Sequence, residues 1–309
     1  MNKMASKKLS DQELMKILKV DAKKLGRFKQ IQRETIKEAE SMDKKKSKTK
    51  KIKVLGISGS ARDKYDMAQE ESNSEELLKV CLEHCKKLGA ETELIKLREF
   101  RIEHCKACYS TTNTQCHFYC SCYPKGTPKA DDMSNILYDK ILGADCLILA
   151  TPVNNFNVST PLKAFMDRCI SLDGSLKPAN PKVPKDKELN IKHMKFVELT
   201  ADNSVPGSGM LRRFIGKVAG VIVTGHEEGA SMVISNLFMT FNHFGMLFPP
   251  FSNMYAMSSV CNSTFADKKI VLGECYEGST KLIAENVMHA AKLVKNTKRT
   301  DWKYDYDSD

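Results

Sequence analysis

Apolar residues follow two alternating patterns from residue 51 onward. Short apolar runs, typical of buried strands, alternate with longer stretches in which apolar residues recur every three or four positions, as on one face of a helix. We expect strands at 52–57, 91–97, 145–151 and 217–224, with further candidates at 196–200 and 246–250. We expect helices at 75–88, 132–142, 160–172, 230–244 and 279–295. Strands that alternate with helices predict the α/β class: a doubly wound parallel sheet of five strands with helices on both faces.

The first 50 residues show a different pattern. Leu14, Ile17 and Leu18, and later Leu25 and Phe28, recur at roughly helical spacing, and a lysine-rich stretch at 43–51 has the composition of a solvated linker. We therefore expect a basic helical extension and linker at 1–50, one α/β domain at 51–298 that contains a cysteine-rich loop at 104–124, and a short C-terminal tail at 299–309.

The positive charge of the chain lies in that extension. Residues 1–50 contain 16 Lys and Arg against 7 Asp and Glu, so they account for +9 of the formal net charge of +11. A near-neutral core argues against a nucleic-acid-binding domain, although the extension could contact an anionic partner. No apolar stretch approaches the roughly 20 residues of a membrane-spanning helix, and no signal-peptide pattern opens the chain. We expect a cytoplasmic protein without membrane contact.

The loops that follow the strands are the places to look for a site, because ligands of parallel α/β sheets bind at the carboxyl ends of the strands. The first such loop, Gly56-Ile-Ser-Gly-Ser-Ala-Arg62 with Ser72-Asn-Ser74, is rich in hydroxyl groups and leads into a helix. Backbone N–H groups, hydroxyls and a helix N-terminus together favour a phosphate. The loop lacks the Gly-Lys-Ser/Thr ending of a Walker A motif, so flavin mononucleotide (FMN) is the first candidate ligand. An ordinary strand–turn–helix junction is the alternative.

Two further strand-end loops carry groups that suit a flat heteroaromatic ring. Asparagine side chains and Phe156 follow Thr151-Pro152, and Ser159 or Thr160 then caps a helix. That helix carries Asp167 and Arg168, which we interpret as a structural ion pair. The loop Thr224-Gly-His226 could place a histidine beside the ring, or serve only as a polar turn.

With these three loops, the chain resembles the NADPH-dependent FMN reductase family of flavodoxin-like proteins. The resemblance extends from about residue 51 to 295 and includes Leu162-Lys163 and Asp167-Arg168. It implies a flavodoxin-like fold in which NAD(P)H passes hydride to FMN, and it implies a homo-oligomer. It implies that the FMN phosphate is held by Ser58, Ser60, Arg62, Ser72, Asn73 and Ser74. It implies that the flavin ring is lined by Pro152, Val153, Asn154, Asn155 and Phe156, with Gly225 and His226 closing the site. We assign no catalytic acid or base, because the flavin carries the redox chemistry.

Five cysteines gather in the loop after the second strand, at Cys105, Cys108, Cys116, Cys120 and Cys122. This loop resembles that of the iron–sulfur flavoproteins, a branch of the same fold, except that Thr111 stands where that branch has its third cysteine. A [4Fe–4S] cluster could use Cys105, Cys108, Cys116 and either of the last two. Structural zinc, with His117 as an alternative ligand, a redox-active dithiol and unmetallated thiols are the other possibilities. We interpret Cys81, Cys85, Cys146 and Cys169 as core residues.

These observations predict an FMN-dependent oxidoreductase that transfers electrons from NAD(P)H, or from a reduced carrier, to an unidentified acceptor. An iron–sulfur cluster would be useful there, since a flavin takes two electrons together and can release them singly. One alternative is a plain NAD(P)H-dependent flavin or quinone reductase with structural or zinc-bound cysteines. A second is a sensor protein that binds flavin, or nucleic acid through its basic arm.

Overall fold

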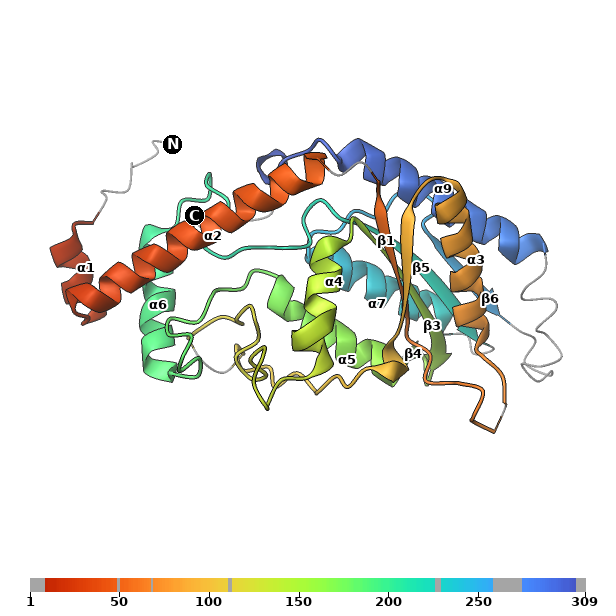
Figure 1. Ribbon diagram of the computed structural model, residues 1–309, viewed down its shortest axis with the longest axis horizontal. Helices are drawn as coiled ribbons and strands as arrows, with labels where there is room; N and C mark the ends of the chain where they lie inside the picture. Colours follow the sequence, from red (N-terminus) through yellow and green to blue (C-terminus); the bar gives the residue numbers. More distant parts are fainter. Residues whose placement is uncertain are drawn as a thin grey trace.

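The computed structural model describes residues 9–48, 51–67, 69–110, 113–225, 229–257 and 274–303. Its centre is one sheet with the strand order β2-β1-β3-β5-β6, in which all neighbours on this path are parallel. The strands are β1 (Lys53–Ser58), β2 (Glu91–Lys96), β3 (Cys146–Asn154), β5 (Val218–Gly225) and β6 (Asn253–Met257). The short β4 (Asn157–Val158) folds back antiparallel on β3. The predicted doubly wound, flavodoxin-like architecture is confirmed (Figure 1).

Helices cover both faces of the sheet because the central strands are apolar on both sides. In β3, Leu147 and Leu149 belong to a core shared with α5 and α7, while Cys146 and Ile148 face the core under α3 and α9. Figure 1 shows the two helix layers on either side of the strands. The helices are α3 (Asn73–Lys87), α4 (Tyr138–Gly143), α5 (Thr160–Cys169), α7 (Ala230–His243) and α9 (Glu274–Val294). A π-helical turn at Met133–Leu137 precedes α4.

The N-terminal extension forms two helices with a core of their own. α1 (Asp11–Leu18) and the long α2 (Ala22–Lys48) pack against α6 (Lys187–Thr200) through Leu14, Phe28 and Phe196. Farther along α2, the Arg213 Nε donates to the Glu38 carboxylate at 2.8 Å. α2 continues to Lys48, although we predicted a linker that begins at residue 43. Within the described residues, no helix combines the length and apolar character that crossing a bilayer requires.

Two of the predicted strands are wrong. Residues 196–200 are the last turns of α6, which begins at the N-cap Asp186 and buries His193, Phe196 and Val197 on one face. Their three- and four-residue spacing is helical, and five apolar-rich residues alone did not reveal it. The edge strand predicted at 246–250 lies instead at β6. Leu247 makes only an isolated bridge to Val218, and the two prolines that follow provide no N–H for a ladder.

Candidate functional site

The hydroxyl-rich loop joins the carboxyl end of β1 to the N-terminus of α3. Five of the residues predicted to hold the phosphate, at the end of β1, in the loop and at the start of α3, are all buried: Ser58, Ser60, Ser72, Asn73 and Ser74. Ser72 is the N-cap of α3 and accepts the Glu75 N–H at 3.3 Å. The hydroxyls of Ser72 and Ser74 are 3.1 Å apart. The Ser60 hydroxyl accepts the Arg62 N–H at 3.1 Å and keeps its own proton to donate.

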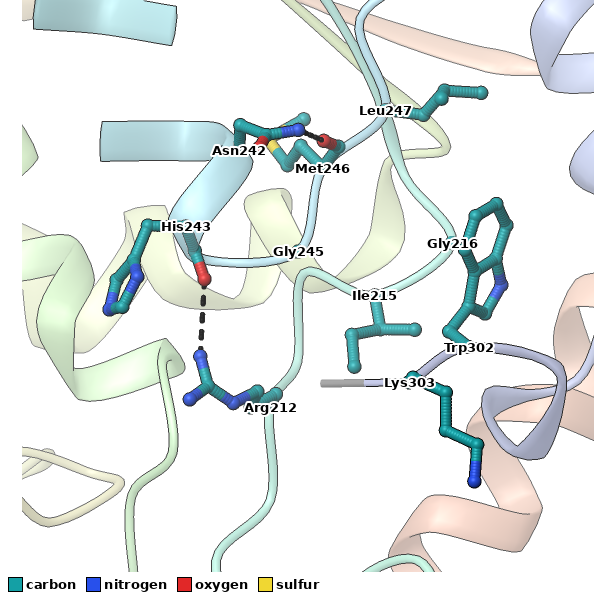
Figure 2. A pocket seen from close by; sticks show the side chains of 10 residues that line it. All are labelled: Arg212, Ile215, Gly216, Asn242, His243, Gly245, Met246, Leu247, Trp302 and Lys303. Atoms are coloured by element: carbon teal, nitrogen blue, oxygen red, sulfur yellow. Dashed lines mark hydrogen bonds between the residues drawn. The ribbon is translucent and has the colours of Figure 1, made fainter. Parts of the chain in front are cut away.

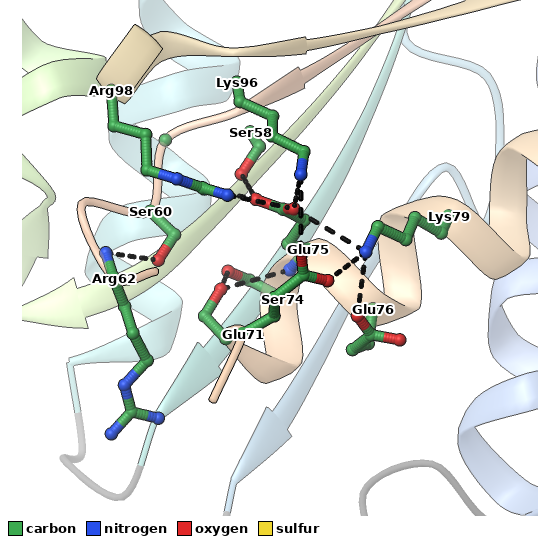
Figure 3. Close-up of polar contacts among 12 residues, drawn as sticks. Ser58, Ser60, Arg62, Glu71, Ser74, Glu75, Glu76, Lys79, Lys96 and Arg98 are labelled. Atoms are coloured by element: carbon green, nitrogen blue, oxygen red, sulfur yellow. Dashed lines mark hydrogen bonds and ion pairs between the residues drawn. The ribbon is translucent and has the colours of Figure 1, made fainter. Parts of the chain in front are cut away.

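Arg62 is placed differently from the serines. Its guanidinium points away from Ser60 and Ser74 in Figure 3, and its Nε lies 3.5 Å from the Asp66 carboxylate. The Ser58 hydroxyl proton is already used, because it is donated to the Glu75 carboxylate at 3.0 Å. A phosphate in this loop would therefore depend chiefly on the hydroxyls of Ser60, Ser72 and Ser74 and on the N-terminus of α3.

A buried carboxylate with three cations lies directly beneath this loop. Glu75 is fully buried, and Arg98 donates to both of its oxygens. Lys96 Nζ lies 3.0 Å and Lys79 Nζ lies 3.7 Å from the same carboxylate (Figure 3). Burial alone would raise the pKa of Glu75, but the hydrogen bonds from Arg98 and Lys96 outweigh it and hold that pKa below its usual value. Glu75 is therefore ionised at neutral pH.

Sequence reasoning missed Lys96 and Arg98. Lys96 is paired in register with Ser58, at the carboxyl end of β2, and Arg98 follows two residues later. The strand-end rule, applied to the second strand as to the others, would have identified them. Both cations already pair with carboxylates, Arg98 with Glu75 and Lys96 with Glu75 and Glu71.

Gly59 is fixed in place by three neighbours. Its N–H donates to the Ala150 carbonyl at 2.7 Å, and its carbonyl accepts the Ser159 hydroxyl. A Cβ at this position would lie 2.8 Å from the Leu162 Cβ and 2.9 Å from the Ser159 Oγ.

We therefore expect Gly59→Ala to lower the free energy of unfolding by about 2 kcal/mol, because neither α5 nor β3 can move away without loss of packing. Urea unfolding measures this. Gly26→Ala, where a Cβ meets nothing within 4 Å, is the matched control and should not destabilise. Equal unfolding curves for Gly59→Ala and the wild type would contradict the close packing of this loop.

The loop predicted to line a flavin ring is a tight hairpin between β3 and β4. Its two central residues, Asn155 and Phe156, have φ values of 48° and 61°, as a type I′ turn requires. Pro152 is half-buried and Val153 is buried, whereas Asn154, Asn155 and Phe156 are exposed. With 57% of its surface exposed, Phe156 is an apolar ring presented to solvent at the carboxyl edge of the sheet.

The β5–α7 loop lies against this hairpin. A Cβ at Gly225 would meet the Val153 side chain at 3.2 Å, and one at Gly229 would lie 2.8 Å from the Phe156 Cα. Glycine thus lets the two loops approach closely. His226, which we predicted to close the site, lies outside the described residues. The three strand-end loops are therefore neighbours, since Gly59 contacts the end of β3 and the start of α5 as well.

The cysteine-rich loop 104–124 follows β2 and a short 3₁₀ turn (Leu97–Glu99) and packs beside α5 and α7. All five of its cysteines are thiols. Cys116 and Cys120 are buried, Cys105 and Cys122 are half-buried, and Cys108 is exposed. The sulfurs of Cys122 and Cys108 are 3.8 Å apart. The structure therefore brings together two cysteines that are separated by fourteen positions.

The cysteines of the loop shift one another's pKa values. The hydrogen bond from Cys122 lowers the pKa of the Cys108 thiol, while partial burial and Cys116, Cys120 and Cys105 oppose that shift. Burial, with Cys120 and Cys105, raises the pKa of Cys116 to about 12. Burial also lowers the pKa of His117 to about 4, which leaves its imidazole neutral at physiological pH.

The donor set of this loop suits a soft metal ion or an iron–sulfur cluster. A tetrahedron of Zn–S bonds of about 2.3 Å has an edge of about 3.8 Å, which is the separation of the Cys108 and Cys122 sulfurs. Among the described residues, however, no three His, Cys, Asp or Glu side chains are close enough to hold a metal ion. The loop thus fits such a group in its chemistry and in one pair of ligands, while Cys105, Cys116 and Cys120 would have to move closer.

Two cavities lie outside the phosphate loop. One of about 390 Å³ lies between the cysteine-rich loop and two helices, and its walls include Cys105, Tyr109, Lys163, Asn236 and Phe244. The other, of about 560 Å³, lies at the amino end of β5 (Figure 2). It is lined by Arg212, Ile215, Gly216, Asn242, His243, Gly245, Met246, Leu247, Trp302 and Lys303.

Asp167 and Arg168 do not pair with each other as we predicted. Adjacent residues of a helix point in directions about 100° apart, so they rarely meet. Asp167 accepts from Lys163 at 2.7 Å, and the buried Arg168 pairs with Asp131 instead. The four cysteines predicted to lie in the core, Cys81, Cys85, Cys146 and Cys169, are buried as expected.

Comparison with known proteins agrees with this fold. Residues 52–258 match the family described as NADPH-dependent FMN reductase. The chain belongs to the NADPH-dependent FMN reductase family. Its members are flavin-dependent NAD(P)H reductases, and the predicted resemblance is confirmed.

Curated relatives include an iron–sulfur flavoprotein of Archaeoglobus fulgidus, 31% identical over 38% of this chain and 48% of that protein. Another, from Methanosarcina thermophila, is 31% identical over 39% of this chain and 54% of that protein. The matched segment spans about half the length of these relatives. Among solved structures, RosB with the bound intermediate 8-demethyl-8-formylriboflavin-5'-phosphate aligns with a TM-score of 0.54 and 17% identity, covering 81% of this chain and 82% of that one. That likeness concerns the fold alone.

Proposed function

We propose that this protein binds FMN at the carboxyl edge of its sheet and transfers electrons from NAD(P)H to an acceptor that is still to be identified. The convergence of the three strand-end loops in a member of the FMN reductase family is the observation that carries this proposal. The hydroxyls of Ser60, Ser72 and Ser74 would bind the phosphate. The hairpin with Val153 and Phe156, closed by Gly225 and by His226, would line the ring.

The chemistry at this site is that of the flavin, which takes two electrons from a hydride donor and can release them singly. The protein contributes binding and orientation. Ser72 and the N-terminus of α3 fix the phosphate end, and the exposed Phe156 ring provides an apolar surface that excludes water from one side of the ligand. No side chain needs to act as an acid or base for hydride transfer, and we assign none.

We further propose that the cysteine-rich loop holds an iron–sulfur cluster within electron-transfer reach of the flavin. The names of the curated relatives and the number of thiols support this, with Cys105, Cys108, Cys116 and one of Cys120 and Cys122 as ligands. The 3.8 Å separation of two sulfurs also suits zinc, which would make the loop structural and the protein a plain reductase. Iron, acid-labile sulfide and zinc per chain in anaerobically purified protein separate the two.

The flavin proposal predicts strong discrimination between FMN and riboflavin, which lacks the phosphate. We expect FMN to bind at least about 100-fold more tightly, because two charge-assisted hydrogen bonds contribute about 1.5 kcal/mol each or more. Ser60→Ala should reduce that ratio about tenfold while riboflavin affinity stays the same. Fluorescence titration of the flavin-free protein measures both affinities.

Ser204→Ala, which changes an exposed serine in a remote turn, is the control and should keep the wild-type ratio. Equal affinity of the wild-type protein for FMN and riboflavin would show that the loop holds no phosphate. A protein that is purified without flavin and binds neither compound would overturn the proposed function as a whole.

A further inference from the structure

A buried ion pair helps to hold the base of the cysteine-rich loop, beside the mutual hydrogen bonds between Arg101 and Asp132. The chain enters the loop through Glu103 and reaches Asp131 shortly after leaving it. The Asp131 carboxylate accepts the N–H of Glu103 at 2.9 Å, and Arg168 donates to the Glu103 carbonyl at 3.1 Å. Arg168 Nη1 and Nη2 also donate to the two oxygens of the Asp131 carboxylate. One residue at the entrance is therefore held by its N–H and its C=O together.

Further contacts extend this arrangement into the loop. The Arg168 guanidinium carbon lies 4.5 Å from the centre of the Tyr123 ring, directly after Cys122 in sequence. The Tyr123 hydroxyl donates to the His104 carbonyl at 2.9 Å, next to Cys105. Arg168 therefore contacts Tyr123, beside the last cysteine of the loop, and Tyr123 in turn binds His104, beside the first.

Arg168 itself has a rigid support. It belongs to α5, its side chain is 1% exposed, and its backbone carbonyl accepts the hydroxyl of the buried Tyr138 at 2.9 Å. Asp131 is fully buried as well, and it also accepts the Ser134 N–H at 3.1 Å. Burying both charges costs free energy, and neither residue belongs to the sheet or to the hydroxyl-rich loop. A role that needs fixed geometry would account for this pair.

We propose that Arg168 and Asp131 are positioning residues for the cysteine-rich loop, whose closure at its base lets the separate thiols bind one metal ion or cluster. The proposal rests on the proposed metal-binding function of that loop. A loop whose ends are already together holds its ligands at a higher effective concentration than an open one. Lysine cannot replace arginine here, because an ammonium group lacks the planar fork that reaches Asp131 and Glu103 at the same time.

The first measurement compares iron, zinc and FMN per chain in the full-length wild type, Arg168→Lys and Asp131→Asn, all purified anaerobically. We expect both variants to lose most of the metal and to keep wild-type FMN. Ser134→Ala is the matched control, because it removes one bond of Arg168, of 3.1 Å, and leaves both ties to Glu103 in place. Arg98→Lys, in the network beneath the phosphate loop, should show the opposite pattern, with FMN reduced and metal retained.

The second measurement does not depend on which metal the loop holds. Metal-free protein is titrated with phenylarsine oxide, whose arsenic forms bonds to two thiol sulfurs while its oxygen leaves with the two thiol protons as one water. A Cys108→Ser variant identifies the part of the signal that comes from the loop. We expect the loop of Arg168→Lys to bind the arsenical about tenfold more weakly than the wild type, because its base keeps the Arg101–Asp132 hydrogen bonds but loses the ties of Arg168.

The outcomes separate the two proposals. A wild type without metal, combined with a weakened arsenical site in Arg168→Lys, would overturn the metal function and leave the positioning role standing. Wild-type metal content and arsenical affinity in both variants would overturn the positioning role. So would a parallel loss of metal and FMN with a lowered melting temperature, since that result indicates general destabilisation. If Arg168→Lys does not fold, Asp131→Asn, which keeps an acceptor for the Glu103 N–H, decides the question.

Discussion

Glu75→Gln should destabilise the flavin-free protein by about 3 kcal/mol. Breaking a buried ion pair from one side leaves its partners charged and buried, and Arg98 and Lys96 retain only 12% and 22% of their side-chain exposure. The same change removes the charge that Arg98 pairs with, so that another anion can pair with it, whereas Lys96 keeps its contact with Glu71 at 3.3 Å. Added FMN or inorganic phosphate should therefore raise the melting temperature of Glu75→Gln by more than that of the wild type. Urea unfolding without ligand and thermal unfolding with ligand measure the two effects.

The control for this prediction lies on the same helix. Glu83 is 62% exposed and its nearest cation, Lys86, is 3.9 Å away, so Glu83→Gln should change stability by less than about 0.5 kcal/mol. A Glu75→Gln protein as stable as the wild type would mean that Arg98 and Lys96 find water or another partner. An unchanged response to phosphate would place these cations outside the anion site.

The sequence was sufficient to predict the sheet because its central strands are apolar on both faces and must be buried on both. The run of apolar residues in β3 cannot face water on either side, so it must lie between two helix layers. The strand-end rule then singled out the hydroxyl-rich loop and the hairpin without any knowledge of contacts. The same logic placed Cys146 of β3 in the core, where it is fully buried.

Features that depend on distant partners were not predictable in this way. α6 lacks a strong amphipathic pattern of its own, and its apolar face is defined by Phe28 of α2, more than 160 positions away. The partner of Arg168 is Asp131 in another segment, and nothing near either residue in sequence indicates the pairing. Glu75 looked like an ordinary acidic residue in the first turn of a helix, yet it organises three cations from β2, the following turn and α3.

The charged residues of this protein therefore serve two different local tasks. Beside the hydroxyl-rich loop, Lys96 and Arg98 surround the buried Glu75 and keep 22% and 12% of their side chains exposed, so this network is partly open to solvent. At the base of the cysteine-rich loop, Arg168 and Asp131 are closed off from solvent and no external anion can reach them. The first arrangement suits reversible binding of a ligand, and the second suits a permanent fixed geometry.

His193 alone should contribute about 3 kcal/mol to the loss of stability between pH 6.5 and pH 4. This side chain is 1% exposed and stacks on Phe28, with 4.9 Å between ring centres, and neither ring nitrogen has a hydrogen-bond partner among the described residues. Burial, with smaller contributions from His117 and Arg27, lowers the pKa of His193 from 6.5 to about 4. The unfolded chain therefore binds a proton in this window that the folded protein does not, and each pH unit costs about 1.4 kcal/mol.

His193→Phe isolates this contribution, because a phenyl ring keeps the stacking on Phe28 and cannot be protonated. We expect the variant to be at least as stable as the wild type at pH 7, since it removes two unsatisfied buried nitrogens. Its advantage should grow by about 3 kcal/mol on acidification to pH 4, as measured by urea unfolding of the metal-free protein. His243→Phe, at a surface histidine that is 71% exposed, should not reproduce that growth. A constant difference between His193→Phe and the wild type across the pH range would mean that His193 is solvated, and that α1 and α2 open away from α6 before the domain unfolds.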